Sequence, residues 1–278
     1  MKKPIVALMY DFDKTLSTKD MQEYGFIPDL NMTANAFWEE VKALTDSEEM
    51  DNILAYMYLM VEKCREKKIR ITREEFNKLG EKIKFFDGVK TWFSRISREG
   101  EKLGVRVEHY IVSSGIKEII EGTEIAKNNT FKKIYACEFM YDYNGTILWP
   151  KFAVNYTAKT QFLFRINKGV LDINSKSAER LNDYTQDKDR RIPFKNMIYI
   201  GDGLTDVPCM KLVKVNGGQS IAVYNPGQGK EIAQKLIKNG RVNFCVPADY
   251  SEGSDLEAIV LAIMNKIKAV SEMESYAD

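Results

Sequence analysis

The chain has 278 residues, of which 44% are hydrophobic and 29% are charged, and its formal net charge is +1. This length allows one large domain, or one domain with a sizeable insertion. The balanced charge argues against nucleic acid or a membrane surface as a bulk partner.

The chain carries no sign of export or membrane insertion. No apolar run approaches the ~20 residues that span a bilayer, and the acidic Asp11 interrupts the apolar start too early for a signal peptide. Four cysteines without CxxC spacing favour reduced thiols over disulfides or zinc ligands. We therefore expect a cytoplasmic protein.

Residues 4–12 form the first predicted element, a buried apolar strand that ends in a turn. Asp11 and Asp13 lie at this end, where two close carboxylates repel each other and lose solvation unless a cation lies between them. A divalent metal ion satisfies that need. Chemistry that uses one carboxylate as nucleophile and the other as acid and base also fits, and a solvated acidic turn is the alternative.

Residues 17 to about 85 show almost no strand pattern. Asp46 is a candidate N-cap for a helix over 47–68, and Thr72 with Glu75 fits a capping box for the next helix. Asn31 or Thr33 can open a further helix that carries Phe37, Trp38 and Val41. One face of the 47–68 helix is apolar and comprises Met50, Ile53, Leu54, Met57, Val61 and Cys64. The segment is a predicted helical insertion, and a subdomain that serves only stability or dimerisation is the alternative.

Strands alternate with helices in the rest of the chain. The predicted strands are 107–113, 133–139, 196–201, 219–225 and 241–247. This alternation favours an α/β fold with a doubly wound parallel sheet. The Asn144-Gly145 pair predicts a hairpin, residues 172–194 read as an exposed, mobile loop, and the single histidine, His109, reads as structural.

Two further strand ends carry polar groups beside glycine. Ser113-Ser114-Gly115 follows one strand, and Gly201-Asp202-Gly203 with Asp206 follows another. Because ligands of open parallel sheets bind at the carboxyl ends of strands, we expect these groups to converge on one site.

These segments resemble the haloacid dehalogenase-like (HAD) phosphohydrolases. The first motif of that family, DxDxT, matches Asp11, Asp13 and Thr15, and the second matches Ser113. The fourth motif, GDGxxD, matches Asp202 and Asp206. The resemblance implies a Rossmann-like core of residues 1–16 and 86–278, and a helical cap domain of residues 17–85.

The third motif of the family is a lysine at the start of a helix, for which Lys159 is the best candidate. Thr157 is a possible N-cap for a helix over 158–166, which would place Lys159 in its first turn. A bound phosphate, or Asp11, would offset the unfavourable interaction of that cation with the helix dipole. Lys151 and Lys168 are the competing assignments.

The resemblance also implies a mechanism. Asp11 would attack phosphorus to form an aspartyl-phosphate, and Asp13 would act as general acid and then general base. Mg²⁺ would be held by Asp11, the backbone carbonyl of Asp13, Asp202 and Asp206. Ser113, Ser114 and Lys159 would bind the phosphoryl oxygens, with Thr15 and Gly203 in supporting positions.

The substrate implied is a small phosphate ester held under the cap. The helical cap and the hairpin are similar to the phosphoserine phosphatase branch, and phosphoserine is one candidate among sugar phosphates, nucleotides and coenzyme phosphates. We expect the cap face bearing Asp20, Glu23, Tyr24 and Phe37 to be the substrate side. Hinges are expected near Leu16-Ser17 and Phe86-Asp87-Gly88. The alternatives are a phosphotransferase or phosphomutase, and a non-catalytic phospho-ligand binder; the sequence does not indicate an oligomeric state.

Overall fold

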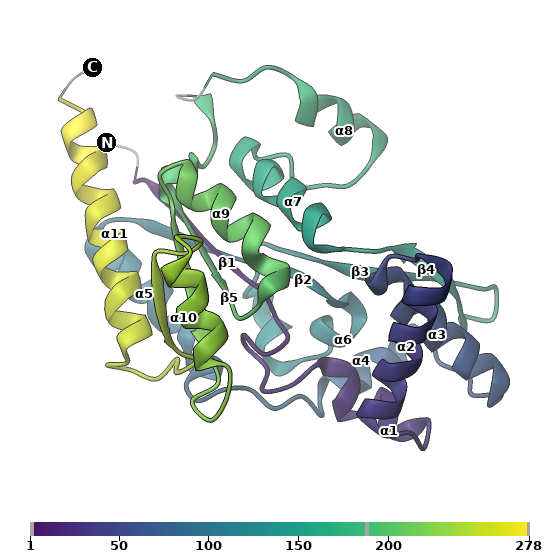
Figure 1. The fold of residues 1–278 in the computed structure, drawn as a ribbon. Helices are drawn as coiled ribbons and strands as arrows, with labels where there is room; N and C mark the ends of the chain where they lie inside the picture. The colour runs from purple at the N-terminus through teal and green to yellow at the C-terminus, as the bar shows by residue number, and fades with distance from the viewer. Residues whose placement is uncertain (1–2, 187–188, 277–278) are drawn as a thin grey trace.

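A seven-stranded sheet forms the centre of the computed structural model, which describes residues 3–186 and 189–276 (Figure 1). The strand order is β4-β3-β2-β1-β5-β6-β7, and only the edge strand β4 runs antiparallel to its neighbour. The strands are β1 (Ile5–Tyr10), β2 (Arg106–Ile116), β3 (Lys133–Tyr141), β4 (Ile147–Phe152), β5 (Met197–Gly201), β6 (Gln219–Tyr224) and β7 (Phe244–Pro247).

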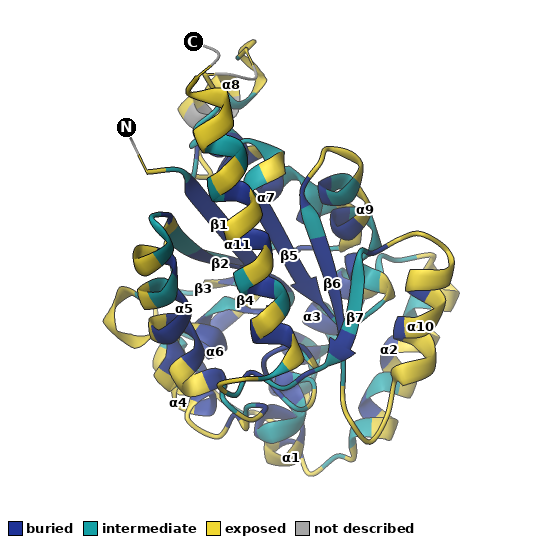
Figure 2. Ribbon diagram, turned by 90° about the vertical axis from the view of Figure 1, so that its left-hand side faces the viewer, coloured by how far each residue is buried: buried dark blue, intermediate teal, exposed yellow. Residues whose placement is uncertain are grey.

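Helices cover both faces of this sheet, so the predicted doubly wound α/β fold is confirmed (Figures 1 and 2). One face carries α7 (Tyr156–Lys168), α9 (Val207–Val215) and α10 (Lys230–Lys238), and the other carries α5 (Val89–Leu103), α6 (Lys117–Glu121) and α11 (Asp255–Glu274). All six residues of β1 are buried between these layers, which explains why that strand reads as a continuous apolar run.

The strand register aligns the ends that carry polar groups. Tyr10, the last residue of β1, pairs with Ile111 of β2 and with Ile200 of β5. From these three residues the chain therefore continues toward the same edge of the sheet.

The predicted helical insertion is present between β1 and α5. Its helices are a short 3₁₀ turn (Met21–Tyr24), α1 (Phe26–Asp29), α2 (Ala34–Glu48), α3 (Asn52–Glu66) and α4 (Arg73–Gly80). Thr33 caps α2, and the capping box of Thr72 and Glu75 is formed at α4.

The predicted helix over 47–68 is present as α3, but its expected start and its expected cap, Asp46, are wrong. Asp46 lies inside α2, which continues to Glu48 and ends at Glu49 in the left-handed conformation, with φ 50°. Asp51 caps α3 instead, because its Oδ1 accepts hydrogen bonds from the backbone N–H groups of Ile53 and Leu54 at 3.0 Å each. Three turn residues therefore divide what the apolar pattern presents as one helix.

The insertion packs closely on the core at two places. A Cβ added to Gly122 of the core would lie 1.9 Å from the carbonyl oxygen of Asn77 in α4, and one added to Gly80 would lie 2.3 Å from that of Ile119 in α6. The helices α4 and α6 thus meet backbone to backbone. The backbone N–H of Ile147 donates to the carbonyl of Ile71 at 2.9 Å, which joins the insertion to the predicted β3–β4 hairpin.

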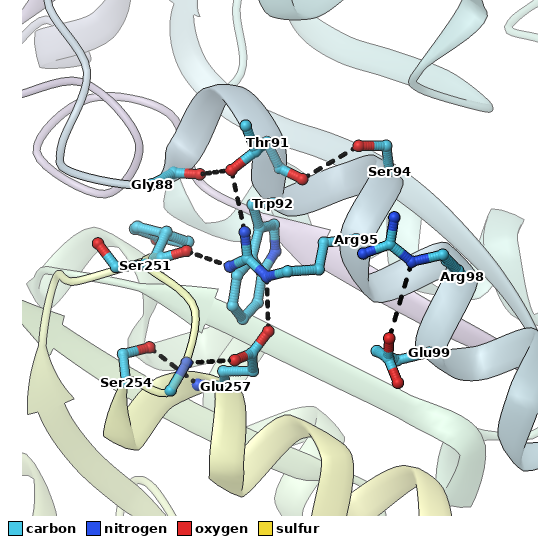
Figure 3. Close-up of polar contacts among 12 residues, drawn as sticks. Gly88, Thr91, Trp92, Ser94, Arg95, Arg98, Glu99, Ser251, Ser254 and Glu257 are labelled. Atoms are coloured by element: carbon cyan, nitrogen blue, oxygen red, sulfur yellow. Dashed lines mark hydrogen bonds and ion pairs between the residues drawn. The ribbon is translucent and has the colours of Figure 1, made fainter.

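A buried ion pair joins α5 to the C-terminal helix α11 (Figure 3). Arg95 Nε donates to Glu257 Oε1 at 2.6 Å, and the two side chains are 8% and 7% exposed. The same guanidinium donates to Thr91 Oγ1 at 2.9 Å and to the carbonyl oxygen of Tyr250 at 2.5 Å. The Arg95 side chain therefore joins helix α5 both to α11 and to the segment before it.

The structure also shows the surroundings of the single histidine and the segment that was expected to be a loop. His109 is buried, with its ring nitrogens 3.0 Å from the Tyr10 hydroxyl and 3.1 Å from the Phe93 carbonyl oxygen, which confirms a structural position. The expected loop over 172–194 is wrong in part, because α8 (Ser175–Asn182) forms there; residues 187 and 188 lie outside the described residues. No helix in the described part of the chain has both the length and the apolar character needed to cross a membrane.

Candidate active site

The three polar strand ends open into a cavity of about 480 Å³ between the sheet edge and the helical insertion. From the core, the cavity is lined by Asp11, Asp13, Lys14, Ser113, Ser114, Lys159, Asp202, Gly203, Leu204 and Thr205. From the insertion, it is lined by Asp20, Gln22, Trp38, Val41, Lys42, Thr45, Asn52, Ile53 and Tyr56.

Asp11 and Asp202, which line the cavity, form an acidic cluster with the fully buried Asp206. One carboxylate oxygen from each lies within 4.8 Å of the others. Asp206 comes close because Gly201 lacks a side chain, since an added Cβ would lie 2.5 Å from Asp206 Oδ2. That oxygen is buried and has no hydrogen-bond partner among the described residues.

Burial and mutual repulsion change the acidity of this cluster. Burial, followed by the charge of Asp206, raises the pKa of Asp11 to about 6, while Lys159 opposes the shift. Burial, Asp206 and Asp11 raise the pKa of Asp202 well above its usual range. Three carboxylates held this close and partly desolvated favour a bound cation.

Lys159 is the cation that reaches the cluster. Its Nζ lies 2.9 Å from Asp11 Oδ1 and 2.8 Å from Asp206 Oδ1, and the residue is fully buried. Burial alone would lower the pKa of this ammonium, but the two carboxylates outweigh it and the pKa is raised. The competing lysines lie elsewhere: Lys151 pairs with Glu138 at 2.9 Å, and Lys168 donates to the Leu181 carbonyl at 2.7 Å.

The helix that carries Lys159 begins earlier than predicted. Asn155, not Thr157, is its N-cap, because Asn155 Oδ1 accepts from the backbone N–H of Ala158 at 2.8 Å. The Thr157 hydroxyl donates to the same oxygen at 3.0 Å. Lys159 therefore occupies the fourth helical residue, at the end of the first turn.

Asp13 lies at the boundary between the sheet edge and the insertion. Its Oδ1 accepts from the backbone N–H of Met21 at 2.8 Å. Burial, followed by the charges of Asp20 and Asp11, raises its pKa well above the usual range. Lys14, the next residue, has φ 58° and its Nζ pairs with Asp20 at 2.5 Å.

The serines occupy an irregular stretch of β2, where the register shifts between Val112 and Ile116. Ser113 is fully buried, and its Oγ accepts from the Gly115 N–H at 2.9 Å. Ser114 Oγ is buried without a hydrogen-bond partner among the described residues, and the Ser114 carbonyl accepts from the Tyr56 hydroxyl of α3 at 2.6 Å. One group in this stretch is thus unpaired beside the cavity.

The two residues predicted to support the site differ in their surroundings. Thr15 Oγ1 lies 3.5 Å from Asp202 Oδ1, and the Thr15 carbonyl accepts from the Tyr250 hydroxyl at 2.9 Å. An added Cβ on Gly203 meets nothing within 4 Å, and its φ of −130° is ordinary for any residue. No close contact therefore requires glycine at position 203.

Of the four residues expected on the substrate side of the insertion, Glu23, Tyr24 and Phe37 are not among the residues that line the cavity. Asp20 lines the cavity, but the Tyr24 hydroxyl contacts the Thr18 hydroxyl at 2.7 Å and donates to the Lys84 carbonyl at 3.1 Å. Phe37 is fully buried against Phe26 and Trp38. Both rings serve the packing of the insertion, so neither lines the cavity.

Sequence reasoning missed the α2 residues that do line the cavity. They are Trp38, Val41, Lys42 and Thr45, which follow the i, i+3, i+4, i+7 spacing of one helix face. That spacing was available in the sequence, but it mixes aromatic, aliphatic, cationic and hydroxyl groups and therefore does not read as an apolar stripe.

Comparison with known sequences places the chain in a family. The profile described as HAD, haloacid dehalogenase-like hydrolase, matches residues 8–211. The chain belongs to this hydrolase family. An uncharacterized protein of Borreliella burgdorferi is 32% identical over 283 aligned residues, which cover 92% of this chain and 95% of that protein.

Several solved structures share the fold at low sequence identity. A phosphoserine phosphatase, solved as a phospho-aspartyl intermediate analogue, is similar with a TM-score of 0.53 and 17% identity over 93% of this chain and 98% of its own. An HAD family hydrolase from Salmonella enterica serovar Typhi has a TM-score of 0.54 and 16% identity, covering 87% of this chain and 67% of that one. Cytosolic 5′-nucleotidase IIIB bound to cytidine has a TM-score of 0.52 and 13% identity over 94% and 86% of the two chains.

Proposed function

We propose that this HAD hydrolase is a Mg²⁺-dependent phosphomonoesterase that acts on a small phosphorylated metabolite through an aspartyl-phosphate. The observation that carries the proposal is the convergence of Asp11, Asp13, Lys159 and Asp202 on one cavity, with the buried Asp206 in contact with Lys159 behind them. The similarity in fold to a phosphoserine phosphatase solved as a phospho-aspartyl intermediate analogue supports this reaction class.

Asp11 is the proposed nucleophile. Its carboxylate lies at the end of β1, and the contact with Lys159 at 2.9 Å favours its ionised form and fixes its orientation. Attack on phosphorus forms an Asp11 acyl phosphate and releases the alcohol, and water then hydrolyses that acyl phosphate to inorganic phosphate.

Asp13 is the proposed general acid and base. Its half-buried position between Asp11 and Asp20 favours the protonated carboxyl that can give a proton to the leaving oxygen. Ser113, Ser114 and Lys159 are the proposed ligands of the phosphoryl oxygens, and the unpaired Ser114 hydroxyl is free to donate to one of them.

The acidic cluster fits a magnesium ion. Asp11, Asp202 and Asp206 offer hard oxygen ligands within 4.8 Å of one another, and the Asp206 Oδ2 atom has no other partner among the described residues. The backbone carbonyl of Asp13 is the fourth proposed ligand. When bound, Mg²⁺ neutralises the repulsion between the attacking carboxylate and the phosphoryl oxygens.

We further propose that residues 17–85 form the cap domain over a core of residues 1–16 and 86–278. The linkers pair with each other: the Phe86 N–H donates to the Leu16 carbonyl at 3.0 Å, and the Thr18 N–H donates to the Lys84 carbonyl at 3.0 Å. Gly88, with φ 79°, packs so closely that an added Cβ would lie 2.2 Å from the backbone of Tyr250 and Ser251. Any hinge motion is therefore proposed at the paired linkers, and not at Gly88.

The test is hydrolysis of p-nitrophenyl phosphate with and without Mg²⁺. We expect Asp11→Asn to lower kcat by several orders of magnitude, while Asp29→Asn, an exposed aspartate of α1, should retain the parental rate. Transfer of phosphate to an added alcohol without release of inorganic phosphate would indicate a phosphotransferase or phosphomutase. Binding of phosphate esters with no turnover would indicate a non-catalytic binder, and either result refutes the proposal.

A further inference from the structure

The insertion side of the cavity carries buried polar atoms that have no hydrogen-bond partner within residues 3–186 and 189–276. Gln22, in the 3₁₀ turn Met21–Tyr24, is 2% exposed and lines the cavity, and its Oε1 has no hydrogen-bond partner among the described residues. Thr45 Oγ1, one helix away on α2, is also buried, lines the cavity and lacks a described partner. The indole Nε1 of Trp38, which lines the same wall, is a third buried atom without a hydrogen-bond partner among the described residues. Buried polar atoms are normally paired, so a carbonyl acceptor, a hydroxyl and an N–H donor on one wall indicate a ligand with complementary groups.

Two of the three lysines that line the cavity are already paired with its carboxylates. On the insertion side, Asp20 supplies a carboxylate that lines the cavity. Lys14 Nζ lies 2.5 Å from Asp20 Oδ2 and neutralises it. Lys159 is similarly held by Asp11 and Asp206. An ammonium group on a substrate would therefore have to displace Lys14 from Asp20.

A carboxylate group on a substrate would meet a weak cationic partner in this cavity. Among the described residues, the remaining cation that lines the cavity is Lys42, which is exposed. Ion pairs at exposed sites contribute little because water and salt screen them. The wall thus offers an amino acid phosphate one carboxylate that Lys14 already pairs and one exposed lysine.

We propose that Gln22 and Thr45 form a specificity subsite for an uncharged, hydroxyl-bearing leaving group, so that the substrate is a sugar or polyol monophosphate. This inference rests on the proposed phosphatase function. A substrate hydroxyl donates to Gln22 Oε1, and a second hydroxyl exchanges a hydrogen bond with Thr45 Oγ1. The aromatic rings of Trp38 and Tyr56, which line the same cavity, offer apolar surface to the C–H groups of such a substrate.

The experiment compares kcat/KM for four kinds of ester with the Mg²⁺-loaded protein. They are p-nitrophenyl phosphate, n-butyl phosphate, phosphoserine, and a panel of sugar and polyol monophosphates that includes glucose 6-phosphate and glycerol 3-phosphate. We expect kcat/KM for the best sugar or polyol phosphate to exceed that for n-butyl phosphate and for phosphoserine by about tenfold or more. A substrate without matching hydroxyl groups leaves the buried polar atoms of the wall unpaired, which weakens binding of its transition state.

Two variants test the assigned residues. Thr45→Val keeps the shape of the side chain and Gln22→Leu removes the amide; each should lower kcat/KM for the best sugar or polyol phosphate about 10- to 100-fold. Both variants should keep kcat/KM for p-nitrophenyl phosphate within about twofold of the parent value. A general loss of fold would lower kcat/KM for both substrates. Ser47→Ala, at an exposed position of α2, is the matched control and should change neither substrate.

The outcomes separate the two levels of the proposal. Hydrolysis of p-nitrophenyl phosphate together with a preference for phosphoserine or n-butyl phosphate overturns the subsite and leaves the phosphatase function standing. Equal losses on all substrates in Thr45→Val and Gln22→Leu also overturn the subsite. If the parent protein hydrolyses none of the esters, the proposed function fails, and the subsite fails with it.

Discussion

Removing one partner of the Arg95–Glu257 ion pair should strongly destabilise the protein. Both side chains are buried, at 8% and 7% exposure, so deleting either leaves an uncompensated charge away from water. The expected cost is about 3–5 kcal/mol for Arg95→Met or for Glu257→Leu. The replacements retain apolar volume, so the loss reports the charge and not a cavity.

The corresponding change in melting temperature follows from the length of the chain. Unfolding entropy is about 2.1 cal/mol/K per residue, which for 278 residues is ~0.6 kcal/mol/K. A loss of about 3–5 kcal/mol therefore lowers Tm by roughly 5–9 °C. In the double variant no charge is left unpaired, and its destabilisation should fall short of the sum of the single losses by about 2 kcal/mol or more.

The assay is urea unfolding followed by circular dichroism, with thermal melts as a second measurement. The control is Arg98→Met, one turn further along the same helix, where Arg98 Nε lies 3.8 Å from Glu99 Oε1 and the arginine side chain is 66% exposed (Figure 3). This control should not change the midpoint measurably. If Arg95→Met shifts the midpoint no more than Arg98→Met, or if the single losses add in the double variant, the pair is not coupled and the reasoning is wrong.

Three further predictions concern the metal, the packing of the insertion and the pH dependence. Mg²⁺ at 100 times its Kd should stabilise the protein by about 2.7 kcal/mol. Asp206→Asn should abolish this gain, because Asp206 is one of the three proposed carboxylate ligands. A melting temperature that does not change when EDTA removes Mg²⁺ would contradict a metal site at these residues. Gly122→Ala should lower the free energy of unfolding by about 1–3 kcal/mol or more, because the new Cβ would lie 1.9 Å from the Asn77 carbonyl oxygen. The control is Gly227→Ala, whose new Cβ would lie 3.7 Å from its nearest atom and which should not change the midpoint of the same urea titration. Burial lowers the pKa of His109 from 6.5 to about 4, so the unfolded state binds that proton first and stability should fall by up to roughly 3 kcal/mol as pH drops through this range. His109→Gln should remove this part of the pH dependence, and identical pH profiles of the two proteins would exclude it.

Local patterns predicted most of the core. The apolar strands, the doubly wound α/β class and the capping box of Thr72 follow from contacts between near neighbours in the chain, which the sequence displays directly. The sequence also predicted that the acids and hydroxyls at the strand ends would lie together, because parallel strands end at the same edge of a sheet. The sequence alone therefore determined that Asp11, Ser113 and Asp202 would lie on one edge.

Helix boundaries in the insertion were harder to predict. The apolar spacing continues from Met50 into α3, so the chain reads as one helix with Asp46 at its start, whereas the turn at Glu49 makes Asp51 the cap. Asn155 was likewise preferred over Thr157 as the N-cap of α7. Neighbouring Asp, Asn and Thr residues cap with similar free energy, so the surrounding packing decides which one is used.

Tertiary structure alone decided the contacts between distant segments. Lys159 reaches Asp11 across 148 positions of sequence, and Arg95 reaches Glu257 across 162. The face of α2 that lines the cavity was equally hidden, because local spacing does not show that Phe37 packs against Phe26 whereas Thr45 meets the cavity. Pairs of this kind depend on how whole layers dock, and no local periodicity records that docking.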